Sequence, residues 1–181
     1  RIWFFTQKGI VGTLDRTTGK IRTTHLPKGE EVTNSVSTDE TGGMYPVSTH
    51  ALYRLDATSS GAPKITCRQK YDRGSIQQPG NLSQGSGTTP TLIGKRWIAI
   101  NDNADPRTRI VVYDRRKNVK NRLHCAKPVL GDNAATTENS LVAAGNSPSS
   151  RNNTDQGGPT AHARRPNTTP GTDTGPNGPP D

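Results

Sequence analysis

The densest group of side chains that could bind a ligand lies in the run Asn101-Asp102-Asn103-Ala104-Asp105. Carboxylate and amide oxygens are the ligands that Ca²⁺ prefers in proteins, and Glu138 adds a further carboxylate later in the chain. The pattern therefore makes calcium a candidate cofactor, with Asp102, Asp105 and Glu138 as its ligands. The spacing does not match the twelve-residue helix-loop-helix calcium loop, and an Asn- and Asp-rich turn before Pro106 explains the same residues without a metal.

Polar residues also begin several of the predicted strands. Asn34-Ser35 and Asn139-Ser140 begin two of them, and Thr89-Pro90 begins a third. If these strands lie side by side, their polar side chains converge from distant parts of the chain. The alternative is that such residues only satisfy the backbone of nearby turns. The candidate ligand-binding residues are Asn34, Ser35, Thr89, Asn101, Asp102, Asn103, Glu138 and Asn139.

The chain shows no recognisable catalytic set. His25, His50, His124 and His162 do not have the spacing of a metal site, and neither a serine nucleophile elbow nor a cysteine-histidine pattern is present. We therefore assign no catalytic residue. Binding is the expected activity, and enzyme activity is left open.

A basic segment covers residues 107–127, which contain eight Lys or Arg and one acid, Asp114. Such a cluster can contact phosphate, which makes nucleic-acid binding an alternative function. Aromatic residues for base stacking are absent from the segment apart from Tyr113, so a solvated loop between strands is the simpler explanation. The residues of the nucleic-acid alternative are Arg115, Arg116, Lys117, Lys120 and Arg122.

Short apolar or β-branched runs separated by turn residues predict an all-β fold, and no sustained helical period is present. Three strands are expected in the first unit, at residues 2–6, 9–14 and 20–26. Four are expected in the second unit, at 33–38, 44–48, 51–55 and 64–70, and four in the third, at 88–93, 96–101, 109–113 and 121–126.

The units form an internal repeat. Leu14-Asp15, Leu55-Asp56 and Tyr113-Asp114 each end an equivalent strand and begin a polar turn. The spacings are 41 and 58 residues, and the longer one contains an extra loop at 71–87. Four-stranded units of about 40 to 50 residues are typical of β-propeller blades. A generic antiparallel sandwich, which needs no repeat, is the alternative.

The composition changes near residue 147. No large apolar side chain follows Val142, and the last part of the chain is rich in Pro, Gly, Thr and Asn. Such a segment has little to bury, so residues 147–181 are predicted to be a disordered tail. Residues 1–146 are predicted to form a partial β-propeller, with about three four-stranded antiparallel blades and the start of a fourth. The abrupt change also suggests a shifted reading frame or gene-model error, which sequencing of the locus tests.

Several segments resemble a known family. Residues 13–20, TLDRTTGK, resemble the blade motif of pyrroloquinoline-quinone-type propellers, and the runs 71–74, 85–91, 101–106 and 137–140 resemble a bacterial group of unassigned activity with this fold. The resemblance covers about residues 1–147. It implies that a small-molecule or protein ligand binds at the mouth of a central channel. The alternative that it implies is the remnant of a propeller enzyme of the sugar-lactone or quinoprotein type.

Two features of the sequence depart from the quinoproteins. Thr23 and Cys67 stand where the family motif has its docking tryptophan, so binding of the quinone itself is not expected. An incomplete propeller also leaves strand edges open, which predicts self-association.

The sequence leaves the compartment open. No apolar run approaches the roughly 18 residues of a membrane span. The chain begins at Arg1 without a methionine, so a secreted or periplasmic protein is possible if a signal sequence precedes it. Cys67 and Cys125 either pair or remain reduced.

Overall fold

The computed structural model describes residues 1–78, 80–131, 138–145 and 147–150. These residues form strands, turns and loops, with no helix in the described part. The first sheet, sheet A, has three antiparallel strands in the order β1-β2-β3. They are β1 (Ile2–Phe5), β2 (Ile10–Leu14) and β3 (Ile21–His25).

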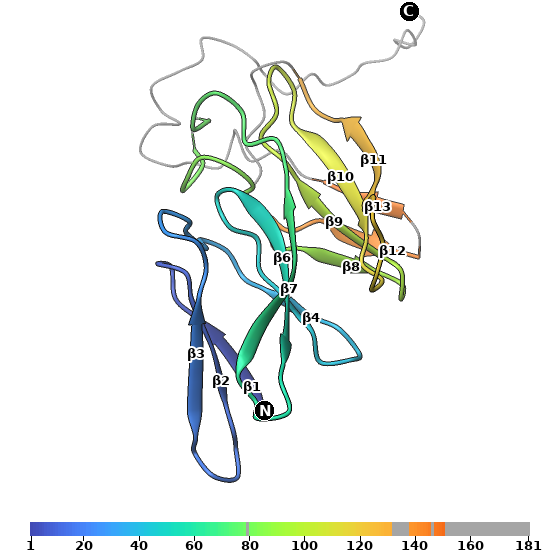
Figure 1. Cartoon of the computed structure of the whole chain (residues 1–181). Helices are drawn as coiled ribbons and strands as arrows, with labels where there is room; N and C mark the ends of the chain where they lie inside the picture. The colour runs from blue at the N-terminus through green and yellow to red at the C-terminus, as the bar shows by residue number, and fades with distance from the viewer. Residues whose placement is uncertain (79, 132–137, 146, 151–181) are drawn as a thin grey trace, which may run out of the picture.

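Three further sheets follow in chain order, and each is built from consecutive antiparallel strands (Figure 1). Sheet B contains β4 (Ser37–Thr38), β5 (Met44–Tyr45), β6 (Ala51–Ala57) and β7 (Pro63–Lys70). Sheet C contains β8 (Thr91–Ile93), β9 (Trp97–Asn101), β10 (Arg109–Asp114) and β11 (Leu123–Pro128). Sheet D contains β12 (Val142–Ala144) and β13 (Ser147–Ser149). None of the sheets closes into a barrel.

The strand register bears out the internal repeat. Leu14, Leu55 and Tyr113 lie on β2, β6 and β10, and each pairs with an apolar residue on both neighbouring strands. The three positions that are equivalent in sequence are therefore equivalent in the sheets. The first three sheets therefore share this pairing, with three strands in sheet A and four in each of sheets B and C.

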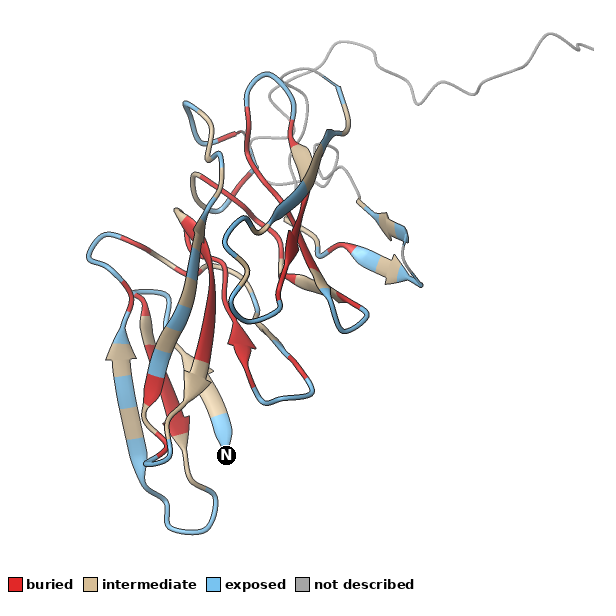
Figure 2. Ribbon diagram, turned by 45° about the vertical axis from the view of Figure 1, so that its right-hand side comes forward, coloured by how far each residue is buried: buried red, intermediate tan, exposed pale blue. Residues whose placement is uncertain are grey.

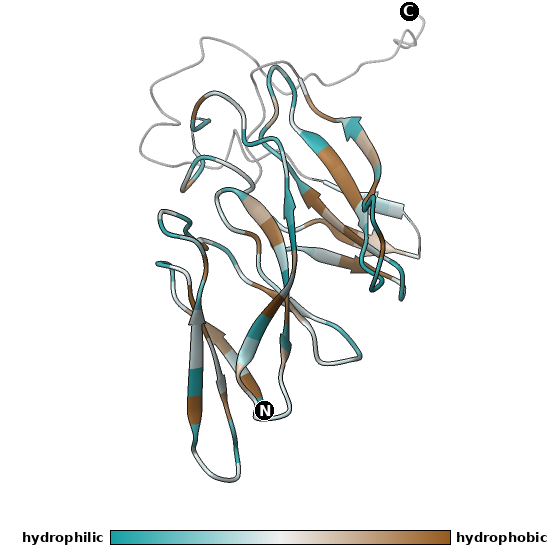
Figure 3. Ribbon diagram, viewed as in Figure 1, coloured by the Kyte–Doolittle hydropathy of each residue, from teal (hydrophilic) through white to brown (hydrophobic). Residues whose placement is uncertain are grey.

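The sheets pack on one another through apolar layers, and the buried residues concentrate on their middle strands (Figure 2). Side chains alternate between the two faces of a strand. Thus Tyr53 on β6 lies in the layer between sheets A and B, whereas Leu52 lies in the layer between sheets B and C. On β10, Val111 lies in the layer between sheets B and C and Val112 in the layer between sheets C and D. Figure 3 shows the resulting mixture of apolar and polar positions along the strands.

The outer face of sheet A has no neighbouring sheet in the described part of the chain, and Ile2 and Ile21 are 48% and 60% exposed on it. On the same face the Phe4 ring lies directly over Gly12. A Cβ at position 12 would lie 2.1 Å from Cζ of Phe4, so only glycine fits beneath the ring. The face is therefore apolar in its centre as well as at its rim.

The predicted all-β class and the four-stranded antiparallel sheets are confirmed. The predicted start of the tail at residue 147 needs correction, because Ser147–Ser149 form β13 and pair with β12. Backbone hydrogen bonds to β12, with one from Oγ of Ser149 to the carbonyl oxygen of Val142, order this segment although it has no large apolar side chain. The rest of the predicted tail, 151–181, lies outside the described residues. No helix in the described part is long and apolar enough to cross a membrane.

Candidate functional site

The run 101–105 begins at Asn101, the last residue of β9, and its second residue, Asp102, is buried. Its Oδ1 accepts hydrogen bonds from the backbone N–H groups of Arg109, at 2.7 Å, and Ala104, at 3.2 Å. Its Oδ2 accepts from Nε of Arg109 at 2.7 Å. Burial raises the pKa of Asp102, although these hydrogen bonds act in the opposite direction. Both oxygens of this carboxylate are thus used inside the protein.

Asn103 holds the loop 71–87 against sheet C. Its Nδ2 donates to the carbonyl oxygens of Arg73 and Ile76, at 2.8 and 2.9 Å. Gly74 in this loop lies against the backbone of Asn103 and has a φ of 66°. A Cβ at position 74 would lie 2.1 Å from the carbonyl oxygen of Asn103, so only glycine fits there. Asp102 and Asn103 are 1% and 2% exposed. Their contacts match the interpretation that such residues satisfy the backbone of turns, and they do not face solvent at a channel mouth.

The predicted calcium ligands Asp102, Asp105 and Glu138 do not form one site. Asp105 accepts a hydrogen bond from the N–H of Ser75 at 2.7 Å, while Glu138 accepts one from the N–H of Leu82 at 2.9 Å. Within the described ranges, no three His, Cys, Asp or Glu residues gather as a metal site would require. The prediction of a shared site at these three residues is wrong, because each carboxylate binds N–H groups of a different segment.

Two predicted binding residues do meet. Nδ2 of Asn34, just before β4, lies 3.5 Å from Oε2 of Glu138, just before β12. Nearby, the Oγ1 of Thr33 and the Oγ of Ser83 are 3.3 Å apart. We call Thr33, Asn34, Leu82, Ser83 and Glu138 the strand-start cluster. It joins three segments, one from before β4, one from the loop 71–87 and one from before β12. Burial raises the pKa of Glu138.

The other predicted binding residues occupy different surroundings. Ser35 is exposed, and Thr89 and Asn139 are half-buried. Asn101 is fully buried and its Nδ2 donates to Oγ of Ser150 at 2.6 Å, whereas its Oδ1 has no hydrogen-bond partner among the described residues. Asn101 thus belongs to the packed end of β9.

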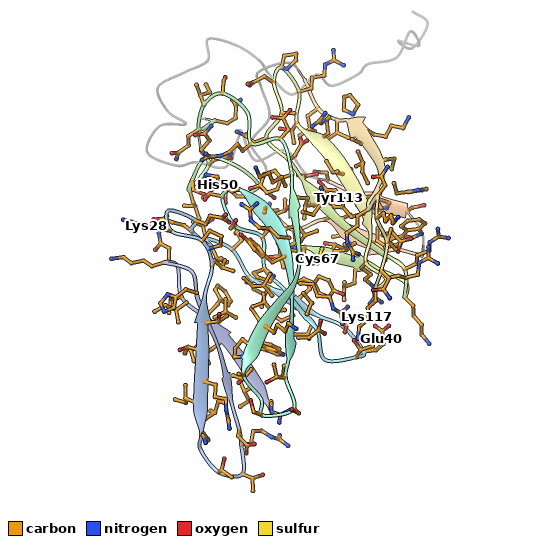
Figure 4. The ribbon with its side chains drawn as sticks, viewed as in Figure 1. Lys28, Glu40, His50, Cys67, Tyr113 and Lys117 are labelled. Carbon is orange, nitrogen blue, oxygen red and sulfur yellow. The ribbon has the colours of Figure 1, made fainter. Side chains whose placement is uncertain are left out.

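The loop 71–87 is also fastened to sheet B by His50, which the sequence did not single out (Figure 4). Its Nε2 lies 2.9 Å from Nη1 of Arg73, and its Nδ1 lies 2.9 Å from Oγ1 of Thr49. A guanidinium group only donates, so Nε2 must accept and the imidazole is neutral. Burial lowers the pKa of His50, and the charge of Arg73 lowers it further. The sequence gives no signal for a contact between positions 50 and 73.

A buried carboxylate, Asp39, joins sheets B and C. Its Oδ2 accepts hydrogen bonds from Nη1 of Arg54 at 2.7 Å and from Nη1 of Arg115 at 2.9 Å. Tyr45 adds a third through its hydroxyl at 2.8 Å. Burial acts to raise the pKa of Asp39, but hydrogen bonds from Thr41, Tyr45 and neighbouring backbone groups outweigh it and hold the pKa well below its usual range. This carboxylate is therefore ionised, and the two arginines balance its negative charge.

The basic segment is divided between buried and exposed side chains. The side chain of Arg115 is 4% exposed, and its Nη2 also binds Glu40 at 3.0 Å. Arg116 pairs with Asp114 at 2.6 Å. Nη1 of Arg122 donates to the carbonyl oxygens of Asp114 and Arg116, at 2.8 and 2.7 Å. The prediction that Arg115 contacts phosphate is therefore wrong, because its guanidinium is packed between two sheets. Lys117 and Lys120 are exposed.

Comparison with known proteins shows one partial similarity. The chain is 36% identical over 76 residues to an uncharacterized protein of Archaeoglobus fulgidus. The matched part is 40% of this chain and 15% of the archaeal protein, so the chain corresponds to a small fraction of that protein's length. No protein family and no solved structure matches the chain.

Proposed function

We propose that this chain is part of a β-propeller that binds a small molecule or a protein segment at the mouth of its central channel. The consecutive sheets, their repeated register and the apolar layers between them support blades that follow one another around an axis. Sheets A, B and C are then three blades, and β12 and β13 begin the fourth.

The observation that carries the binding proposal is the contact between Asn34 and Glu138. These residues are 104 positions apart and precede the first strands of two sheets. In a propeller, the first strand of each blade lines the channel, so residues just before these strands lie at its rim. The strand-start cluster is therefore the place where a ligand would contact several blades at once.

The charge of the cluster indicates the chemistry of its ligand. Asp39, Asp102 and Asp114 each form an ion pair with arginine, whereas the hydrogen bonds of Glu138 within the described part come from the neutral groups of Leu82 and Asn34. A half-buried carboxylate without a counter-charge is unfavourable. A ligand with hydroxyl or ammonium groups would donate hydrogen bonds to the carboxylate of Glu138 and stabilise its charged form.

A propeller enzyme is the second candidate, because a partly buried carboxyl group with a raised pKa is what a general acid requires. Glu138 has this property. A binding protein releases its ligand unchanged, whereas an enzyme releases a product.

Saturation-transfer NMR with glucose, ethanolamine and lysine as separate probes tests the binding proposal on the whole chain. At least one probe is expected to give a signal, and Glu138→Gln and Asn34→Ala are expected to remove it. Glu31→Gln is the matched control. Glu31 lies on the same connection between β3 and β4 as Asn34, but its carboxylate accepts a hydrogen bond from Gln7. Signals that are absent, or that survive Glu138→Gln, contradict the proposal. Conversion of a bound probe supports the enzyme instead.

A further inference from the structure

The β8–β9 turn and the β10–β11 turn lie side by side at one end of sheet C. The N–H of Arg115 donates to the carbonyl oxygen of Arg96 at 2.9 Å and joins them. Residues 94–97 and 114–122 contain one acid, Asp114, and it is buried. Glu40 of sheet B lies nearby (Figure 4), and its carboxylate pairs with Arg115 at 3.0 Å. Five cations of the two turns are exposed to solvent, namely Lys95, Arg96, Arg116, Lys117 and Lys120.

Asp114 holds two of these cations in place. Its Oδ2 accepts hydrogen bonds from Nη2 of Arg116 at 2.6 Å and from Nε of Arg96 at 3.1 Å. Hydrogen bonds from Arg116 and Arg96 outweigh burial and hold the pKa of Asp114 well below its usual range, so the carboxylate is ionised. One carboxylate does not neutralise two guanidinium groups, whose side chains are 54% and 53% exposed. Within the described residues, Arg96 donates to Asp114 through Nε, so its terminal nitrogens can bind a ligand.

An aromatic pair lies beside the two arginines. Trp97 on β9 is paired in register with Asp114 on β10, so the two side chains lie on the same face of sheet C. The imidazole of His124 on β11 stacks on the indole of Trp97, with ring centroids 4.1 Å apart and 26° between the planes. Cζ of Arg96 lies 4.2 Å from the centroid of the same indole. Guanidinium, indole and imidazole thus form one stacked group, in which His124 is exposed.

We propose that this end of sheet C binds single-stranded nucleic acid, with the exposed cations on the phosphates and one base stacked on the imidazole of His124. Guanidinium and ammonium groups are suited to phosphate, and an aromatic ring among them is typical of single-strand binding. The bases of a duplex are already stacked on one another, so the ring favours an unpaired strand. The basic segment alone offers no such ring, because Trp97 precedes it and Tyr113 is buried. The surface does not rest on the function proposed for the strand-start cluster.

Fluorescence anisotropy of a labelled oligothymidylate, titrated with the whole chain, tests the proposal. Each phosphate contact with a single strand contributes about −0.7 to the slope of log K against log salt concentration. Contacts from all five exposed cations would therefore weaken binding about 100-fold between roughly 50 and 200 mM NaCl. An abasic strand of the same length has the same phosphates but no bases. It is expected to bind at least about fivefold more weakly, as the loss of one stacked base implies.

Two variants, each with a matched control on sheet A, locate the binding surface. Arg96→Gln is expected to weaken binding and to reduce the salt slope by about 0.7. Arg16→Gln removes the same charge from the exposed turn between β2 and β3, and it is expected to change little. His124→Ala is expected to weaken binding of oligothymidylate at least about fivefold and to leave binding of the abasic strand unchanged. His25→Ala removes an exposed histidine of β3 and is expected to have no effect.

Three results would overturn the proposal. Absence of binding at roughly 50 mM NaCl would show that the cations of sheet C do not bind phosphate. Equal losses from Arg96→Gln and Arg16→Gln would mean that only the net charge of +9 attracts the strand. Equal affinity for oligothymidylate and the abasic strand would mean that no base stacks, and the surface would then bind polyanions of any kind.

Discussion

Two acids of this protein, the buried Asp39 and the half-buried Glu138, have opposite electrostatic surroundings. Asp39, between sheets B and C, receives two arginines and a tyrosine hydroxyl. Glu138, in the strand-start cluster, receives one backbone N–H and one side-chain amide. The pKa of Asp39 is held low and that of Glu138 is raised. The first acid therefore stabilises the fold in its charged form, whereas burial makes the charged form of the second acid unfavourable.

The largest expected effect is that of Asp39→Asn. It leaves the Arg54 and Arg115 guanidinium groups, with side chains 9% and 4% exposed, without their shared charge. Removing one partner of a buried ion pair costs about 3 to 5 kcal/mol in the free energy of unfolding. Urea denaturation of the whole chain measures this change. Glu40→Gln, which removes only the exposed partner of Arg115, is the control and is expected to have little effect. Equal losses in both variants contradict a central role for Asp39.

The next effect is that of Gly74→Ala, which tests how the loop 71–87 supports the strand-start cluster. The new Cβ would clash with the carbonyl oxygen of Asn103 at 2.1 Å, and the positive φ disfavours alanine. We expect a loss of about 2 to 3 kcal/mol by urea denaturation. Gly94→Ala is the matched control, because Gly94 has a φ of 52° but nothing within 4 Å. It is expected to cost about 1 kcal/mol. If the two losses are the same, the close contact with Asn103 has no energetic role.

A smaller effect is expected from the pH dependence of His50. Its pKa in the folded protein is lower than its usual value of 6.5, so the unfolded chain binds more protons as the pH falls below 6.5. The contribution of His50 to the free energy of unfolding is therefore complete above pH 6.5 and is lost as the pH falls below it. Thermal melts are therefore expected to give a lower Tm at pH 5.5 than at pH 7.5. His50→Gln should reduce the difference, and an unchanged difference would assign it to other residues.

The smallest effect is that of Glu138→Gln, and its direction separates the two acids. The raised pKa means that the folded protein holds a proton on Glu138 more tightly than the unfolded chain does. Stability from this group is present below its usual pKa of 4.5 and is lost as the pH rises through the raised value. We expect the variant to be slightly more stable than the natural chain at pH 7 and equal to it at pH 4, by urea denaturation. A less stable variant at pH 7 means that the charge of Glu138 supports the fold.

The sequence predicted the strands and their repeat because both depend on local patterns. Leu55 and Tyr113 mark equivalent strands through short apolar runs that end at a polar turn, and the sheets have this arrangement. The beginning of the tail was placed slightly too early, because Ser147–Ser149 pair with β12, and this pairing needs no large apolar side chain. Side-chain composition contains no information on such a pairing.

The site was predicted less well, since its contacts join distant positions. Asn103 binds residues about 30 positions earlier, and Asp39 binds Arg115, 76 positions later. The basic segment therefore gave no sign that Arg115 is buried. One signal could have been used. Arg54 stands inside the apolar strand ALYRLDA, and an arginine in such a strand requires a buried acidic partner.

The order of the sheets has a consequence for how the protein is made. Each sheet is formed from consecutive strands and packs on the preceding sheet, so a chain leaving the ribosome can complete sheets A and B before sheet C exists. Asp39 then has Arg54 beside it, but Arg115 is synthesised 76 residues later. Until that arginine emerges, the acidic end of sheet B remains incompletely neutralised. The junction of sheets B and C is thus completed late in biosynthesis, after β9, β10 and Arg115 have been made.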